Sequence, residues 1–335
     1  MQRIAAYFTE ALAYRVIKAW PGVDKALNST KISHFSEEVH VRKLFLEMFP
    51  FLKVAYLLSN QSILESMEGE KMVHVIDLHA SEPTQWLALL RSLNLRREGP
   101  PHLRITGVHQ HKELLDQMAH KLIEEAEKLD VPFQFNAVVS NLENLDIEKL
   151  RVKSGEALAI SSVLQLHPLL SFECEVNRTS TIESFLRSLR SLSPKVVIVT
   201  ERDSSHNGVT FMERLLEALY YYAAFFDCLE STMFRSSLER LKVEKMLFGE
   251  EIKNIIACEG VDRKQRHEKL EKWVQRFEGV DFRSNKFSCF GIRQANLFLK
   301  SYACDSYKIK EVNGGVVICW QDRSLYSLSS WKCRI

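Results

Sequence analysis

The chain has 335 residues, of which 46% are apolar, and its formal net charge is +2 with a pI near 8.1. This apolar content is enough for a large core, and the near-zero charge excludes the long-range positive field that marks many nucleic-acid binders. Seven cysteines stand singly with no C-x-x-C pair, which argues against a disulfide framework or structural zinc and for reduced thiols in the cytosol or nucleus.

The first 67 residues contain only helical patterns. These lie at residues 3–19, 37–49 and 51–67. Pro21-Gly22 ends the first helix and Pro50 separates the other two, because proline cannot continue a helix. We therefore expect residues 1–67 to form a helical cap segment, with residues 207–250 contributing to it.

A six-residue apolar strand at 72–77 opens the second part of the chain, followed by a turn and an amphipathic run through Arg96. A continuous apolar strand suits the middle of a parallel sheet, which helices cover on both faces. Further strand patterns lie at 103–108, 133–139, 157–163 and 195–200, with helical patterns at 112–129 and 182–192. Strands that alternate with helices predict a mostly parallel α/β sheet.

The remaining elements change in character toward the C-terminus. A long apolar helix is expected at 207–227, mixed-charge helices at 238–258 and 263–277, and strands at 307–312, 316–321 and 324–331 around Asn313-Gly314. A Rossmann-like sheet finished by an antiparallel hairpin is the layout of class I methyltransferases. We expect that α/β core over residues 68–335, with the helical cap beside it.

The turn after the first strand lacks the residues that bind a nucleotide or a methyl donor. Residues 77–86 contain no glycine, so the backbone cannot approach a phosphate closely. Ser81 is expected to cap the next helix, and Glu82 to place a carboxylate at the positive end of its dipole. The second strand ends Gly107-Val108-His109, without the acid that holds ribose hydroxyls. We predict no cofactor there.

A metal site is the rival interpretation of this edge of the sheet. Polar residues follow three of the predicted strands: Asp77 and His79, His109 and His111, and Glu201 and Asp203. The carboxyl ends of parallel strands meet in one crevice, so these side chains could share an ion. The alternative, which we favour, is that they cap helices and bond loops, so no metal is predicted. His74 lies within a buried strand and is expected to be a hydrogen-bonded core residue. The sequence contains no G-x-S-x-G motif to supply a catalytic nucleophile and no H-E-x-x-H motif to form a metalloprotease site.

Two further groups are candidates for contacts with partners. The densest basic stretch runs from Arg263 to His267, and a solvated helix face is favoured there over a phosphate contact. Trp320, Tyr326 and Trp331 cluster near the C-terminus. Core packing is their default role, because a terminal hairpin must be anchored, and a partner groove is the alternative, because Trp and Tyr are common interface anchors.

These motifs together resemble a known family. Val73-His74-Val75-Ile76-Asp77, with Gln85-Trp86 after it, is similar to the VHIID motif of plant GRAS proteins. The end of the chain, from Trp320 to Ser329-Ser330-Trp331, resembles the family's SAW motif with Ser in place of Ala. Further matches occur at 103–108, at Glu201 with His206-Asn207, at 248–260, and at Arg263, Arg266, His267 and Glu268 with Trp273. They follow the family's order over almost the whole chain, which is more specific than any single motif.

The resemblance implies a plant nuclear transcriptional regulator that is not an enzyme and that acts through protein contacts in gibberellin signalling and root development. It implies other GRAS proteins, including DELLA proteins, and INDETERMINATE-DOMAIN zinc-finger transcription factors as partners, with indirect contact to DNA and none to membranes. We expect direct partner contacts from Arg263, Arg266, Trp320, Tyr326 and Trp331. The motif residues expected to be mainly structural are Val73, His74, Ile76, Asp77, Gln85, Trp86, Glu201, His206 and Asn207.

Three further expectations accompany this interpretation. The family's first leucine-rich helices are expected upstream of residue 1, which would leave the pairing cap incomplete in this chain. The alternative function is a methyltransferase-like or metal-dependent enzyme that uses the crevice at the carboxyl ends of the strands. A second alternative, direct DNA reading through Arg263 and Arg266, is disfavoured by the near-neutral charge.

Overall fold

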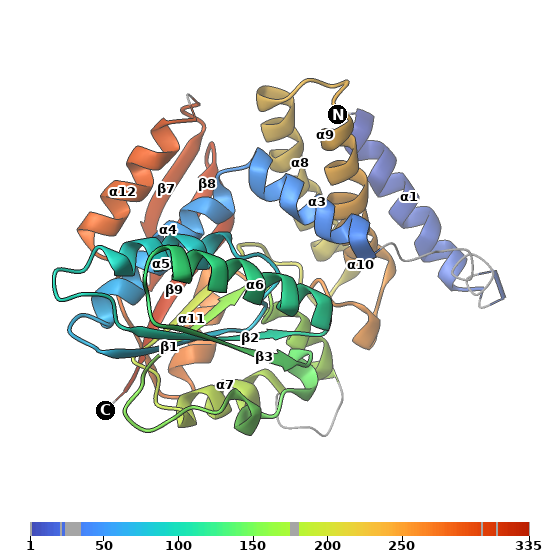
Figure 1. Ribbon diagram of the computed structural model, residues 1–335. Helices are drawn as coiled ribbons and strands as arrows, with labels where there is room; N and C mark the ends of the chain where they lie inside the picture. Colours follow the sequence, from blue (N-terminus) through green and yellow to red (C-terminus); the bar gives the residue numbers. More distant parts are fainter. Residues whose placement is uncertain are drawn as a thin grey trace.

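The structure is a computed structural model that describes residues 2–20, 22–23, 35–174, 181–302, 304–312 and 314–334. Within these residues, nine strands form one sheet in the order β3-β2-β1-β4-β5-β9-β8-β7, with β6 paired to β9 (Figure 1). The strands are β1 Met72–Asp77, β2 His102–His109, β3 Phe133–Val139, β4 Ala157–Val163, β5 Val196–Arg202, β6 Phe282–Ser284, β7 Tyr307–Val312, β8 Gly315–Trp320 and β9 Arg323–Cys333.

The pairing directions confirm the predicted fold class. Strands β1 to β5 are parallel to their neighbours, whereas β9 runs antiparallel to β5 and starts the antiparallel part that β8 and β7 complete. The strand order reverses between β1 and β4, which is the point where ligands enter a doubly wound sheet. The expected crevice therefore lies at the carboxyl ends of these strands.

Helices cover both faces of the parallel strands. On one face, α4 (Phe51–Ser66), α5 (Thr84–Asn94) and α6 (Lys112–Lys128) share a buried apolar cluster with β1 and β2. On the other, α7 (Thr181–Ser191) and α11 (Leu270–Glu278) pack on β4 and β5. α12 (Cys289–Lys300) packs against α4. Burial on both faces explains why the central strands β1, β4 and β5 are mostly apolar.

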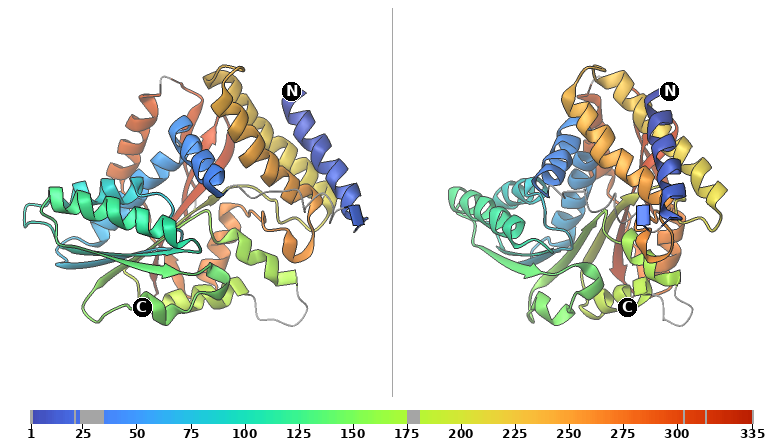
Figure 2. Two further views of the ribbon diagram at one scale, coloured as in Figure 1. Left: turned by 45° about the vertical axis from the view of Figure 1, so that its right-hand side comes forward. Right: turned by 90° about the vertical axis from the view of Figure 1, so that its right-hand side faces the viewer.

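A third group of helices gathers at one side of the sheet (Figures 1 and 2). It contains α1 (Gln2–Lys18), α3 (Phe35–Met48), α8 (Phe211–Thr232) and the run α9 (Leu238–Lys242), a π-helical segment (Val243–Gly249) and α10 (Glu250–Ala257). Apolar side chains from these helices form one cluster that continues to β8 and β9. Buried Glu244 accepts hydrogen bonds from Arg3 and Arg240, which ties the start of α1 to the π-helical segment.

Several boundaries differ from the sequence expectation. The helix predicted at 263–277 begins only at Leu270, because Arg263 and Arg266 turn inward and donate to backbone carbonyls of His206 and Gly260. β6 and α12 were not predicted. Pro21 and Asn313, to which a helix end and a turn were assigned, lie outside the described residues. Among the described helices, none combines the length and the apolar character that crossing a bilayer requires.

Candidate functional site

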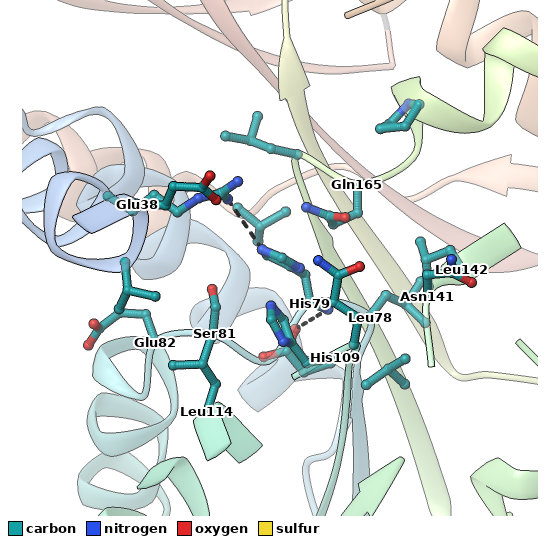
Figure 3. A pocket seen from close by; sticks show the side chains of 18 of the residues that line it. Glu38, Leu78, His79, Ser81, Glu82, His109, Leu114, Asn141, Leu142 and Gln165 are labelled. Atoms are coloured by element: carbon teal, nitrogen blue, oxygen red, sulfur yellow. Dashed lines mark hydrogen bonds between the residues drawn. The ribbon is translucent and has the colours of Figure 1, made fainter. Parts of the chain in front are cut away.

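A crevice of about 500 Å³ opens at the carboxyl ends of β1, β2 and β4. Its floor includes the turns that follow these strands, and Glu38, Arg42 and Lys43 of α3 form one wall. Figure 3 shows His79 and His109 at its centre and Gln165 at its far side. This is the position that a doubly wound sheet offers to a ligand.

Asp77, at the end of β1, is fully engaged by its own loop. Its Oδ1 accepts from the backbone N–H of His79 at 2.9 Å, and its Oδ2 accepts from Nε1 of Trp86 at 2.7 Å. The carboxyl group is buried, and burial raises the pKa of Asp77 to about 6. Asp77 therefore joins strand, turn and helix α5, a structural role of the kind that the family resemblance implies.

The N-terminus of α5 carries its own anion. Oε1 of Glu82 accepts from the backbone N–H of Thr84 at 3.3 Å and from its hydroxyl at 2.6 Å. The helix has Pro83 at its N-cap with no side-chain cap, so the expectation that Ser81 caps it is wrong. Because a carboxylate already lies at the positive end of the dipole, a phosphate or a methyl-donor carboxylate would meet like charge there.

Gly107 in β2 serves packing. A Cβ at this position would lie 2.7 Å from the Cβ of Ala80 and 2.8 Å from Cζ of Phe135. The glycine therefore lets the turn after β1 lie directly against β2.

Of the residues that the metal interpretation requires, the structure brings the histidines together but not the carboxylates. The rings of His79, His109 and His111 are neighbours, with centroids 4.9 and 5.5 Å apart. The carboxylates needed to complete a site are used elsewhere: Glu201 accepts from Leu166 N–H and bonds His167 at 2.7 Å, and Asp203 accepts from Leu270 N–H at 2.8 Å. Across the described ranges, no group of three or more His, Cys, Asp or Glu side chains is arranged to hold a metal ion.

Two histidines of the crevice, His79 and His109, are shifted toward the neutral form. Burial, then the charge of Arg42, holds the pKa of His79 well below its usual value. Burial lowers the pKa of His109 to about 4. Nη1 of Arg42 lies 3.3 Å from Nε2 of His79, which places a guanidinium beside a neutral imidazole at the mouth of the crevice.

The arginines of the basic stretch from Arg263 to His267 form hydrogen bonds inside the protein. Arg263 donates to the carbonyl of His206 at 2.9 Å, and Arg266 donates to Oδ1 of Asn207 at 2.9 Å. Asn207 in turn donates to Glu268 at 2.8 Å. Arg263 and Arg266 are only 5% and 3% exposed, so the expectation of a solvated helix face is wrong, as is that of a direct partner contact through these two side chains.

The aromatic C-terminal end is also buried. Trp320, Tyr326 and Trp331 are 1%, 0% and 0% exposed. Trp331 stacks on Phe277 of α11, with ring centroids 4.7 Å apart and planes 11° apart. The structure contradicts their expected direct contact with a partner and agrees with core packing, because no surface of these side chains is left to a second protein.

The other motif residues lie in structural positions. Val73 and Ile76 point to opposite faces of the sheet and belong to different apolar clusters. The side-chain amide of Gln85 donates to Asn60 of α4 at 3.3 Å. His74 lies 2.8 Å from Thr106 Oγ1 and 3.0 Å from Nη2 of Arg104, as expected for a hydrogen-bonded core histidine. Nothing in these contacts requires a ligand.

One buried ion pair was not found from the sequence. Arg202 at the end of β5 pairs with Glu251 of α10, and both side chains line the crevice. The hydroxyl of Tyr222 also donates to Glu251 at 2.9 Å. Arg202 and Glu251 are 49 residues apart, and no local pattern signals such a pair.

The apolar surface of the third helix group was also missed. Met212, Leu216 and Tyr220 on α8 are 56%, 48% and 67% exposed. Leu12 and Val16 on α1, and Trp20 just after its end, are 39%, 62% and 64% exposed. The spacing of four residues predicts an apolar stripe on each helix, but it does not show which part of that stripe stays uncovered.

Comparisons with known proteins agree with the motif analysis. Residues 1–332 match the GRAS domain family. The chain is 55% identical to Scarecrow-like protein 3 of Arabidopsis thaliana, over 100% of this chain and 81% of that protein. It is 36% identical to DELLA protein RGL1 of Arabidopsis thaliana, over 99% of this chain and 62% of that protein. The crystal structure of SCL7 from Oryza sativa superposes with a TM-score of 0.87 at 31% identity, over 98% of this chain and 89% of that one. The chain therefore belongs to the GRAS domain family, whose members include Scarecrow-like and DELLA proteins.

Proposed function

We propose that the chain is a plant nuclear transcriptional co-regulator that acts through protein–protein contacts, and not an enzyme, in gibberellin signalling and root development. Membership of the GRAS family and the similarity to Scarecrow-like and DELLA proteins support this. We also propose the division into a cap, residues 1–67 with 207–250, and an α/β core, residues 68–335.

The partners that we propose are other GRAS proteins, including DELLA proteins, and INDETERMINATE-DOMAIN zinc-finger transcription factors. Contact with DNA is indirect in this proposal. The net charge of +2 and the inward orientation of Arg263 and Arg266 support that view, because direct binding needs accessible cations that replace counterions on the phosphates.

The observation that carries the proposal is the exposed apolar stripe on α8, formed by Met212, Leu216 and Tyr220. A helix normally turns its apolar stripe to a core and its polar face to water. Tyr221, Tyr222 and Phe225 already fill the inner side of α8, so the stripe is additional to the core. Aligned exposed apolar side chains of this kind mark protein interaction sites.

Introducing charge into the stripe tests the proposal. We expect the double substitution Met212→Glu, Leu216→Glu to weaken binding to a purified INDETERMINATE-DOMAIN protein or DELLA GRAS domain at least about tenfold, because two apolar contacts are lost and two carboxylates would be desolvated. Both side chains are about half exposed, so the fold should persist. Isothermal titration calorimetry measures the affinity.

Leu297→Glu is the matched control, because Leu297 is 53% exposed on a different helix, α12. Its affinity for the same partner should equal that of the wild type. Unchanged affinity in the double variant, or an equal loss in the control, would contradict a role for the stripe.

A further inference from the structure

The crevice beneath α3 has the size and lining of a small-molecule site. Its volume of about 500 Å³ falls within the range of ligand pockets, roughly 300–1,000 Å³. Apolar side chains contribute to it from several elements: Phe45, Leu52, Leu78, Leu114, Val163 and Leu247. Polar groups enter between them at a few points: Arg42 lines the crevice, as do His79 and Gln165, which Figure 3 shows. An apolar wall with a few polar groups suits a ligand that has an apolar body and one polar end.

The cations that line the crevice differ in how they are paired. Lys264 lies 2.8 Å from Glu143, Lys43 lies 3.9 Å from Glu47, and Arg202 is paired with Glu251. Among the described residues, Arg42 has no carboxylate partner, and its recorded polar contact is Nε2 of His79 at 3.3 Å. A guanidinium carries five N–H donors, so most of those on Arg42 are left for an anion.

Two of the three carboxylates near Arg42 are engaged by other groups, and the third, exposed Glu38 one turn earlier on α3, forms no ion pair with Arg42 in the described part of the chain. Both oxygens of Asp77 accept hydrogen bonds from its own loop, and Glu82 accepts from Thr84. A guanidinium binds a carboxylate more strongly than it binds a neutral ring, because both partners are charged and the contact can be bidentate. Arg42 is thus the available anion-binding group of the crevice.

His79 supplies a second donor. A guanidinium can only donate, so Nε2 of His79 accepts from Arg42, and Nδ1 of the neutral ring carries the hydrogen. One unpaired cation beside one neutral donor matches a single negative charge better than a phosphate dianion. We propose that the crevice binds a small organic monocarboxylate with an apolar body, whose carboxylate is held by Arg42. This goes beyond the proposed function, because it gives the regulator a small-molecule binding site that is separate from the stripe on α8.

Titration calorimetry of the purified chain with abietate, a rigid tricyclic monocarboxylate, tests the inference. The matched ligand abietinol has the same body with an alcohol in place of the carboxylate. We expect saturable micromolar binding of abietate and at least tenfold weaker binding of abietinol. Laurate serves as a flexible second probe, so that the shape of one ring system does not decide the result.

Two variants locate the carboxylate. Arg42→Gln should weaken binding of the acid at least tenfold and leave binding of the alcohol unchanged. Lys43→Gln removes the same charge from the next residue of α3, where the lysine is paired with Glu47, and should change the affinity less than twofold. Gln165→Trp should weaken both ligands, because an indole would fill part of the crevice.

Failure of both acids to bind, equal affinity for acid and alcohol, or an effect of Lys43→Gln as large as that of Arg42→Gln would overturn the inference. None of these outcomes bears on the stripe of α8, whose variants are measured against a protein partner.

Discussion

Replacing Trp331 by alanine is expected to lower the free energy of unfolding by about 3–5 kcal/mol, the usual cost of emptying a buried aromatic site. The side chain is fully buried between β9 and α11, where it stacks on Phe277, and its indole N–H donates to Ser329 Oγ at 2.9 Å. Alanine would leave a cavity and remove that hydrogen bond. Urea unfolding followed by circular dichroism measures the change.

The control is Leu297→Ala on the outer side of α12, where 53% of the residue is exposed. This substitution should change stability by less than about 0.5 kcal/mol. A Trp331→Ala protein of normal stability that fails to bind its partner would contradict the burial of this side chain and restore the contact role expected from the sequence.

Lowering the pH from 7 to 5 is expected to destabilise the fold, because several histidines are buried in the neutral form. Burial, then the charge of Arg104, lowers the pKa of His74 to about 4. Burial likewise holds the pKa of His206 and of His267 well below the usual value. A group whose pKa is lower in the folded chain stabilises the fold above its unfolded pKa, and that stabilisation is lost as the pH falls toward the folded pKa.

The relative size of the histidine and aspartate contributions decides whether the free energy of unfolding falls or rises between pH 7 and pH 5. For His74, the loss between pH 7 and pH 5 is about 2 kcal/mol, because the unfolded chain takes up a proton that the folded chain excludes. Asp77 acts in the opposite sense, since burial raises its pKa to about 6 and its protonation favours the folded form by about 1 kcal/mol over the same interval. His206 and His267 add to the loss, so the histidines prevail.

Urea unfolding at several pH values between 5 and 7 checks this. His206→Gln should reduce the number of protons taken up on unfolding by about one, so that the free energy of unfolding changes less with pH. The reason is that this ring lies fully buried beside Tyr222 and His267. His120→Gln, on the exposed side of α6, should leave the dependence unchanged. Constant stability across the interval would show that these histidines titrate in the folded protein.

The parallel part of the sheet could be predicted from the sequence, because its central strands β1, β4 and β5 are buried on both faces and are mostly apolar, whereas edge strand β3 alternates polar and apolar residues over Phe133–Asn136. The strands at 72–77, 133–139 and 157–163 have the predicted limits. The carboxylate of Glu82 at the start of α5 was also predicted, since a helix N-terminus depends on residues close in sequence. The capping partner was not, because Ser81 and Glu82 can both accept from the first turn.

Residues whose role depends on distant partners could not be placed from the sequence. Arg263 and Arg266 resemble a solvated basic face until the loop with His206 and Asn207 folds against them and accepts their hydrogen bonds. The converse holds for α8, which is apolar on most sides, so that its sequence does not show which side remains uncovered. α12 was missed because exposed Phe290 and Leu297 blur its periodicity.

The sheet is doubly wound in its parallel part, and the carboxylates of Asp77 at the end of β1 and of Glu82 in the turn after it are both engaged by neighbouring groups. Titration calorimetry of the purified chain with S-adenosylmethionine tests this most directly. We expect no saturable heat, because the carboxylate of Glu82 lies at the start of α5 and Asp77 is committed to Trp86 and the backbone of His79. A one-to-one isotherm with a micromolar Kd would contradict the prediction that this turn binds no methyl donor.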